Sequence, residues 1–334
     1  MSFVISHKYE EIVSLDNLLL AWEEFVEEKK KRADVRDFSK TLLRNIISLH
    51  RDLTSNTYCH SSYEAFNITD PKPRRIHKAT VRDRLLHQAI YRILYPAFNE
   101  IFIHDSYSCR THKGTHKAFR QLVSYSRKVS KNYNQPCWAL KMDIRKFFDS
   151  IDHEILFGLL RQRIDDPELL YVIYDIIKSF EFSTGKGMPL GNLTSQLFAN
   201  IYMDPLDKFV KHYFKAKYYI RYADDFLILS QNPDELLGYF VEVNTFLKEK
   251  LKLNVHPNKI SLRKLSQGID FVGYVALPYY SLPRRKTVKR IFKKVGLSTQ
   301  EQLEKSLPSY LGYLGHASSY KIRRKILNTT RSAE

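Results

Sequence analysis

The sequence of 334 residues is poor in the features that mark several common classes of protein. Its three cysteines, Cys59, Cys109 and Cys137, show neither a pairing pattern nor metal-ligand spacing, so we expect reduced thiols in a cytoplasmic protein. Only 11 glycines occur, and the GxxxxGK[ST] and GxGxxG patterns of nucleotide-binding loops are absent. No apolar run approaches the length of a membrane span, and the N-terminal segment turns acidic before a signal-peptide core forms. The sequence therefore predicts no membrane partner.

Positive charge is what the sequence has in excess. The chain carries 54 Lys and Arg against 36 Asp and Glu, a formal net charge of +18. Hydrophobic residues at 43% and aromatic residues at 13% are too abundant for a disordered chain. Basic residues gather in segments 72–92 and 108–131 and again after Pro283. A single run of this kind is most simply a solvated helix face, but successive runs with little acidic relief favour a surface that binds nucleic acid.

The pattern of apolar residues predicts helices alternating with short strands. We expect helices over residues 11–31, from Val81 to a stop at Pro96, after Asp152, over 193–201 with an interruption at Pro205, and from Asn232-Pro233 to Leu251. We expect strands at 138–143, in a hairpin over 217–230, and near 253–256 and 269–275. This order is typical of an α+β fold in which helices back an antiparallel sheet.

Acidic residues stand at two turning points of this predicted sheet. Asp143 closes a strand, and Asp224-Asp225 forms the tip of a hairpin. Adjacent strands would bring these carboxylates together, where they would repel one another unless a cation lay between them. Carboxylate oxygens with open positions suit Mg²⁺, and two such ions can catalyse phosphoryl transfer. An Asp-Asp pair is also ordinary turn chemistry, so this motif does not decide by itself.

The surrounding segments resemble the reverse transcriptases. The resemblance rests on Tyr222-Ala-Asp-Asp225, on Asp143-Ile-Arg-Lys-Phe-Phe148 and on residues 187–202, which are similar to the family's third palm motif. Further matches in the family's order are Lys72-Pro-Arg74 with Asp83-Arg84, residues 104–110, Lys259, and Phe271-Val-Gly-Tyr274. The resemblance implies a right-hand polymerase fold of the α+β class. It places an N-terminal helix and fingers at 1–137, a ferredoxin-like palm at 138–277 with a fingers-side insertion around 155–190, and a small helical thumb at 278–334.

The same resemblance implies a metal-binding triad. Asp143 and Asp224 would hold two Mg²⁺ ions, with Mn²⁺ as a substitute, and Asp225 would stand beside them in a less direct role. Lys259 matches a lysine proposed to protonate the leaving pyrophosphate, although a surface lysine is as good an account of it.

Three further residues match positions that contact the incoming nucleotide. Phe148 matches the steric gate that excludes a ribose hydroxyl, with an ordinary core phenylalanine as the alternative. Arg74 would clamp the triphosphate through its planar fork of donors. Arg75 is a weaker candidate, and either arginine is also compatible with a solvated charge.

Leu190-Gly191 departs from the Pro-Gln-Gly found in many reverse transcriptases and resembles diversity-generating retroelement enzymes of bacteria and phages. That subfamily implies error-prone cDNA synthesis opposite template adenine, or mutagenic retrohoming. Its implied partners are a structured template RNA, the RNA/cDNA duplex, dNTPs and a pentameric helical accessory protein. A retron, group II intron-like or phage-defence reverse transcriptase remains an alternative, as does an inactive polymerase-shaped scaffold that binds RNA.

Overall fold

The computed structural model describes residues 4–70 and 72–331, and these residues separate into two units. The first unit combines Met1–Ile103, Ile144–Phe209 and Asn244–Asn254, and the second combines His104–Asp143, Val210–Val243 and Val255–Glu334. Each unit is therefore built from segments that are distant in the sequence. No helix in the described part of the chain is both long and apolar enough to cross a bilayer.

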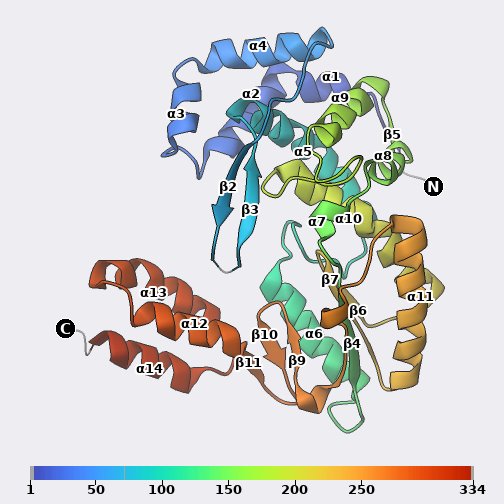
Figure 1. Cartoon of the computed structure of the whole chain (residues 1–334), viewed down its shortest axis with the longest axis vertical. Helices are drawn as coiled ribbons and strands as arrows, with labels where there is room; N and C mark the ends of the chain where they lie inside the picture. The colour runs from blue at the N-terminus through green and yellow to red at the C-terminus, as the bar shows by residue number, and fades with distance from the viewer. Residues whose placement is uncertain (1–3, 71, 332–334) are drawn as a thin grey trace. The chain divides into compact units, whose positions relative to one another are not determined.

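The first unit is mainly helical, with one β-hairpin that extends from its helices (Figure 1). Fully buried residues of α2, α4 and α5, such as Leu18, Leu49 and Leu86, supply its core. Its elements are β1 (Ile5–Ser6), α1 (Tyr9–Val13), α2 (Leu15–Val26), α3 (Ala33–Ser39), α4 (Leu42–Thr54), β2 (Glu64–Ile68), β3 (Arg74–Lys78), α5 (Val81–Ile101), α7 (Phe147–Ser150), α8 (His153–Arg161), β5 (Ile164–Asp165), α9 (Pro167–Lys178) and α10 (Leu193–Lys208).

Several helix boundaries in this unit differ from those predicted. The single helix expected over 11–31 is wrong: Ser14 is extended, its Oγ caps the start of α2 by accepting from the Asn17 amide, and α2 ends at Val26. The stop at Pro96 is also wrong, because α5 continues to Ile101. Pro205 likewise lies inside α10 rather than interrupting it. Burial of Leu94 and Phe98 around Pro96 outweighs the loss of one helical hydrogen bond.

The second unit contains a four-stranded antiparallel sheet in the order β6-β7-β4-β8. A split βαβ connection produces this order, so the α+β prediction is confirmed. The elements are α6 (Thr115–Val129), β4 (Trp138–Asp143), a π-helical turn (Phe209–Tyr213), β6 (Tyr219–Tyr222), β7 (Asp225–Ser230), α11 (Pro233–Leu251, which ends in the first unit), 3₁₀ turns at Pro257–Lys259 and Leu265–Gln267, β8 (Ser261–Lys264), β9 (Ile269–Phe271), β10 (Tyr274–Ala276), β11 (Ser281–Pro283), α12 (Arg285–Val295), α13 (Gln300–Gly315) and α14 (Tyr320–Arg331).

The strand expected at residues 253–256 is reduced to a single β-bridge at Val255. The Leu253 amide donates to the Leu247 carbonyl, whereas the His256 amide donates to the Asp143 carbonyl in the manner of an antiparallel bridge. Ser261–Lys264 forms the edge strand beside β4 instead. The piece expected over 269–275 is two strands, β9 and β10, separated by a turn in which Val272 and Gly273 have positive φ.

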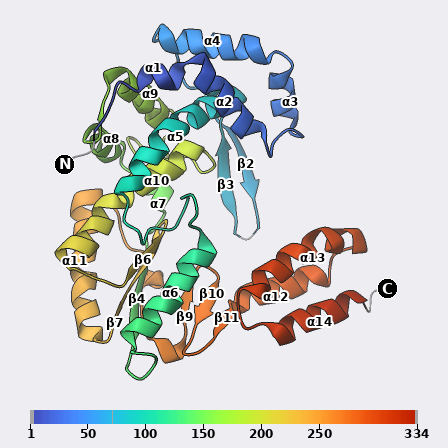
Figure 2. The same cartoon turned by 180° about the vertical axis from the view of Figure 1, so that it is seen from behind.

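Two cores support the second unit. Buried side chains of α6, β4, β6, β7, β9 and β10 form the first, and α12, α13 and α14 enclose the second around Leu314 and Ile326. The three C-terminal helices lie side by side in Figures 1 and 2. The Tyr274 hydroxyl donates to the Tyr313 carbonyl at 2.9 Å, which ties α13 to β10.

Candidate active site

Strand register places the predicted carboxylates at one end of the sheet. In the antiparallel pair of β4 and β7, Asp143 lies opposite Asp225, and the pairing continues to Trp138 opposite Ser230. β6 pairs with β7 so that Tyr222 lies opposite Asp225, which leaves Ala223 and Asp224 as the hairpin turn. Asp143 and the distant pair Asp224-Asp225 are therefore brought to the same end of two neighbouring strands.

A buried arginine holds this hairpin turn in place. Arg221 is 0% exposed, and its guanidinium donates to the Ala223 carbonyl and to the Ser106 hydroxyl, both at 3.0 Å. The Arg221 amide donates to the Asp105 carbonyl, and the Arg221 carbonyl accepts from the Tyr107 amide. Ala223 has a φ of 55°, a left-handed conformation that costs a residue with a side chain roughly 1 kcal/mol. The anchored arginine thus fixes a strained turn beside Asp224 and Asp225.

Each of two carboxylates at this edge is paired with a lysine. Lys259 Nζ lies 2.6 Å from Asp143 Oδ1, and Lys141 Nζ lies 2.9 Å from Asp225 Oδ2. Lys141 also donates to the Asp270 carbonyl at 2.9 Å, which connects β4 to β9. Sequence reasoning missed Lys141, although its position two residues before Asp143 on one strand puts both side chains on the same face.

The environment of Asp225 disfavours its charged form. Burial raises the pKa of Asp225 to about 6, the Lys141 ammonium opposes that rise, and the carboxylates of Asp143 and Asp224 add to it. The Oδ1 atom of Asp225 is buried and has no hydrogen-bond partner. The three acids are thus close enough to repel one another, and one oxygen is left without a compensating donor.

A pocket of about 290 Å³ opens beside Asp143 and Lys259. Lys141, Arg263 and Asp270 also contribute to its wall. Lys259 reaches this position because it ends the 3₁₀ turn that follows His256, whose amide binds the Asp143 carbonyl. The pocket therefore combines two carboxylates with three basic side chains, a lining suited to a polar, charged ligand.

The other predicted site residues lie in the first unit, where the backbone joins them. The Leu190 carbonyl accepts from the His77 amide at 3.3 Å, so the loop that carries Leu190 and Gly191 lies against β3. Gly191 has a φ of +120°, and a Cβ there would meet Ile76 Cγ2 at 3.3 Å. Exposed Arg74 and Arg75 begin the same strand.

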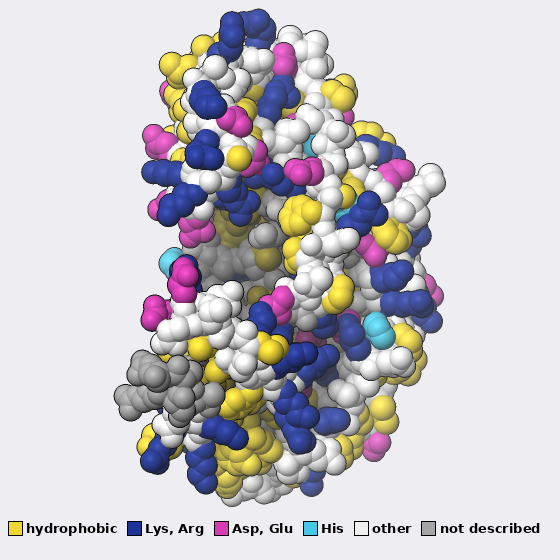
Figure 3. All heavy atoms as spheres, turned by 60° about the vertical axis from the view of Figure 1, so that its left-hand side comes forward, with side chains coloured by type: hydrophobic (Ala, Val, Ile, Leu, Met, Phe, Trp, Pro, Cys, Tyr) yellow, Lys and Arg dark blue, Asp and Glu magenta, His cyan; other side chains and the backbone are white. Residues whose placement is uncertain are grey.

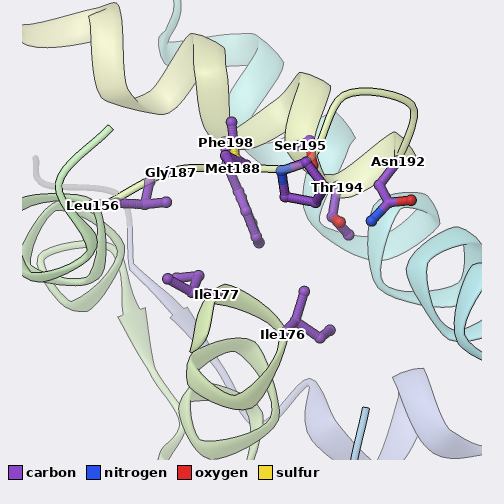
Figure 4. Close-up of a pocket in the computed structure, with 10 residues that line it drawn as sticks. Leu156, Ile176, Ile177, Gly187, Met188, Asn192, Thr194, Ser195 and Phe198 are labelled. Carbon is purple, nitrogen blue, oxygen red and sulfur yellow. The ribbon is translucent and has the colours of Figure 1, made fainter. Parts of the chain in front are cut away.

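Phe148 joins this group through the polypeptide that precedes Leu190. The Phe148 carbonyl accepts from the Met188 amide at 2.8 Å. A small pocket behind the loop is lined by Met188, Leu156, Ile177 and Phe198, and Figure 4 shows these side chains around it. Gly187 allows the tight approach, because a Cβ there would lie 2.6 Å from the Phe182 amide nitrogen. The backbone of half-buried Phe148 is therefore fixed to a packed loop.

Comparison with known proteins agrees with this geometry. The family profile described as reverse transcriptase (RNA-dependent DNA polymerase) matches residues 69–276, which is more than half of the chain. The chain belongs to the reverse transcriptase family. The matched segment includes every site residue predicted above, from Arg74 to Lys259.

Relatives of this reverse transcriptase chain include intron-encoded proteins. Group II intron-encoded protein LtrA of Lactococcus lactis is 25% identical over 308 residues, which cover 71% of this chain and 50% of LtrA. The COX1/OXI3 intron 2 protein of Saccharomyces cerevisiae is 23% identical over 291 residues, covering 68% of this chain and 33% of that protein. Protein YkfC of Escherichia coli is 23% identical over 232 residues, covering 58% and 60%. The chain thus spans between a third and three fifths of the length of these relatives.

Reverse transcriptases use divalent metals such as Mg²⁺, and the sheet edge has suitable donors. Hard carboxylate oxygens are the ligands that Mg²⁺ prefers, and the unpartnered, buried Asp225 Oδ1 is such an atom. Among the described residues, no three His, Cys, Asp or Glu side chains are close enough to hold a metal by themselves. Lys141 and Lys259 supply the positive charge that balances the carboxylates in this arrangement.

Proposed function

We propose that the chain is an RNA-directed DNA polymerase that adds nucleotides by two-metal nucleotidyl transfer. The observation that carries this proposal is the register of Asp143 opposite Asp225, with Asp224 in the adjoining turn. The raised pKa of Asp225 supports it: burial is the main cause of the rise, the Asp143 and Asp224 carboxylates add to it, and a bound cation would stabilise the charged form of this group. An inactive RNA-binding scaffold is therefore the weaker interpretation.

The residues divide the work of the reaction. Bound Mg²⁺, or Mn²⁺ in its place, would stabilise the attacking and leaving oxygens of phosphoryl transfer. Asp143, Asp224 and Asp225 would hold the ions. Lys259, 2.6 Å from Asp143, would release that carboxylate on metal binding and donate a proton to the leaving pyrophosphate.

The incoming dNTP would contact residues of the first unit. Exposed Arg74 would bind the triphosphate with its guanidinium fork, with Arg75 in a lesser role. The ring of Phe148, whose backbone carbonyl binds the Met188 amide, would exclude a ribose 2′-hydroxyl, and Leu190-Gly191 would contact the nascent base pair. In this proposal the chain divides into fingers at 1–137, a palm at 138–277 with an insertion around 155–190, and a thumb at 278–334.

Primer extension with Mg²⁺ on an RNA template tests the catalytic assignment. Asp224→Asn removes one charged ligand and keeps the side-chain shape, so we expect loss of extension. The matched control is Asp234→Asn, because Asp234 is an exposed aspartate in the first turn of α11. Equal extension by wild type and Asp224→Asn would refute the assignment, and melting curves show whether both variants fold.

We propose further that the enzyme is of the diversity-generating type, making adenine-mutagenic cDNA from a structured retroelement RNA with a pentameric helical accessory protein. Leu190 supports this proposal, because leucine offers only apolar contact where a glutamine would hydrogen-bond near the base pair. The loop that carries Leu190 is fixed to β3 by the His77 amide, so a changed side chain would act at one place. We expect Leu190→Gln to lower misincorporation opposite adenine several-fold at unchanged bulk extension. Unchanged error rates in sequenced cDNA would contradict the subtype.

A group II intron-type reverse transcriptase is the second candidate. The observation in its favour is the match to intron-encoded proteins, including LtrA and an Arabidopsis thaliana protein named nuclear intron maturase 3. The two candidates differ in fidelity at template adenine. Accurate copying by the wild-type enzyme at adenine would favour the intron type.

A further inference from the structure

A basic groove lies at the end of the sheet opposite the carboxylates. It has a volume of about 440 Å³ and lies between the C-terminal end of α6, residues 214–218 and the start of α11. Lys128 and Lys131 line one part of it, and Lys215 and Lys217 line another. Ser230, also in the groove, pairs with Trp138 at the opposite end of the β4–β7 ladder from Asp143 and Asp225. Five residues of strand, roughly 17 Å, separate the two ends.

The backbone around the groove holds two of these lysines in unusual conformations. Lys131 has a φ of 48° and begins three successive left-handed residues, and Lys215 has a φ of 54°. The Lys131 amide donates to the Lys128 carbonyl at 3.2 Å, which fixes the first turn against α6. The Ala216 amide donates to the Val210 carbonyl at 3.2 Å, which fixes the second turn. Both turns are defined by hydrogen bonds.

Aromatic rings pack beneath these lysines. Phe214 stacks on Tyr239 with ring centroids 4.5 Å apart. Tyr218 meets Tyr125 edge to face at 5.2 Å, and Lys217 Nζ lies 5.8 Å from the centre of the Tyr218 ring. Because these rings pack against one another, their faces are occupied, and we do not expect nucleic-acid bases to stack on them.

The charge in the groove is unbalanced. Glu235 is the one acidic residue in its lining, and its carboxylate accepts from the Ser230 and Tyr239 hydroxyls. Within the described residues, Lys128, Lys131, Lys215 and Lys217 form no salt bridge. Favourable interaction with a helix dipole accounts for the lysines that end α6, but Lys215 and Lys217 come from a separate segment. Four exposed ammonium groups around one groove give it a positive potential that attracts an anion from outside the chain.

We propose that this groove binds the phosphate backbone of an RNA at a second site, distinct from the catalytic edge of the sheet. The ligand class rests on the proposed polymerase function, because the template RNA is then the polyanion that the protein meets. Lysine ammonium groups bind phosphates as point charges and do not read bases, so the contact is independent of sequence. The groove would hold a part of the template RNA that is not being copied.

The test compares two charge reversals of equal size. Lys131→Glu with Lys215→Glu alters the groove, and Lys30→Glu with Lys31→Glu alters two exposed lysines in the turn after α2. The probe is a long hairpin RNA, titrated by fluorescence anisotropy at several salt concentrations. We expect the groove variant to lose affinity about tenfold or more and to lower the slope of log K against log salt by roughly two or more. The control variant should bind like wild type.

Primer extension on a short RNA template with an annealed DNA primer separates this proposal from the proposed function. Wild type and the groove variant should extend the short substrate equally, because it does not reach the groove. Equal binding of the hairpin RNA by the groove variant and wild type would overturn the proposal while leaving polymerase activity intact. Equal weakening by both charge reversals would also overturn it, since the effect would then belong to net charge. The proposal would also be overturned if an acidic protein bound to the groove and the groove variant lost affinity for that protein while it kept its affinity for RNA.

Discussion

The two units hold their proposed functional residues by different means. In the second unit, strand register and ion pairs position charged side chains, as in Lys141 with Asp225 and Lys259 with Asp143. In the first unit, backbone hydrogen bonds and a glycine position a loop, and exposed Arg74 forms no salt bridge within the described part of the chain. The difference suits their proposed tasks, because catalytic groups must be preorganised whereas groups that bind a substrate can close on it.

Surface charge does not distinguish these tasks. Figure 3 shows Lys and Arg side chains over much of the face that it displays, with Asp and Glu side chains among them. Positive charge is therefore widespread on this face, in keeping with the net charge of +18. What distinguishes the proposed catalytic end of the sheet is a buried carboxylate oxygen beside matched lysines.

The largest expected effect separates the two units by kinetics. Asp143→Asn should lower kcat on the order of a thousandfold with little change in the KM for dNTP, because it removes a group that acts on the transition state. Arg74→Ala should raise the KM for dNTP about tenfold and leave kcat nearly unchanged, because it removes binding shared by ground and transition states. Steady-state primer extension measures both constants. A kcat loss for Arg74→Ala as large as that for Asp143→Asn would show that the units do not divide the work in this way.

The sequence predicts where the three acids lie in the strands better than it predicts the contacts that support them. Asp143 at a strand end and Asp224-Asp225 at a hairpin tip are visible as local patterns, and the ladder follows once the strands pair. Burial of Arg221 and the double contact of Lys141 depend on residues 106 and 270, which no local pattern connects to them. Tertiary contacts of that kind become evident only when the chain is folded.

Helix boundaries fail for a related physical reason. Proline and serine rules describe the cost of a residue to an isolated helix, and at Pro96 buried side chains of α5 outweigh that cost. At Ser14 the local rule acts in the opposite direction, because the side chain caps a new helix inside a continuous apolar pattern. The spacing of apolar residues indicates which face of a helix is buried, but it does not indicate where the helix ends.

The next effect concerns the pH dependence of stability in the second unit. Burial raises the pKa of Asp225 from its ordinary value of 3.8 to about 6. Between these values the unfolded chain is ionised and the folded chain is protonated, so metal-free stability should fall as the pH rises through this window. Asp225→Asn removes this titrating group. We therefore expect the free energy of unfolding of the variant, relative to that of wild type, to rise by about 2–3 kcal/mol between pH 3.8 and about pH 6.

Urea unfolding in the presence of a chelator, measured across the window, gives this difference. Asp234→Asn, which alters an exposed carboxylate, is the control and should show a smaller change. The quantity to compare is how the difference in free energy of unfolding between variant and wild type changes with pH. Loss of the ion pair with Lys141 shifts this difference by a constant amount that does not vary with pH in this range. A difference that does not grow with pH would show that Asp225 is ionised in the folded protein without its metal.

The smallest expected effect is a pH dependence of stability in the first unit. It runs opposite to that of the second unit, because stability falls as the pH is lowered. Burial lowers the pKa of His87 from 6.5 to about 3, and the ring lies against Thr194 Oγ1 at 3.3 Å. Below pH 6.5 the unfolded chain takes up a proton that folded His87 does not, so stability should fall as the pH falls. Wild type should lose about 2 kcal/mol of its free energy of unfolding between pH 7 and about pH 5, and His87→Gln should remove this loss, as measured by urea unfolding at the two pH values. The same substitution at exposed His212 should change the loss little. Equal recovery by the two variants would mean that buried His87 is protonated in the folded state, and the two units would then not titrate in opposite directions.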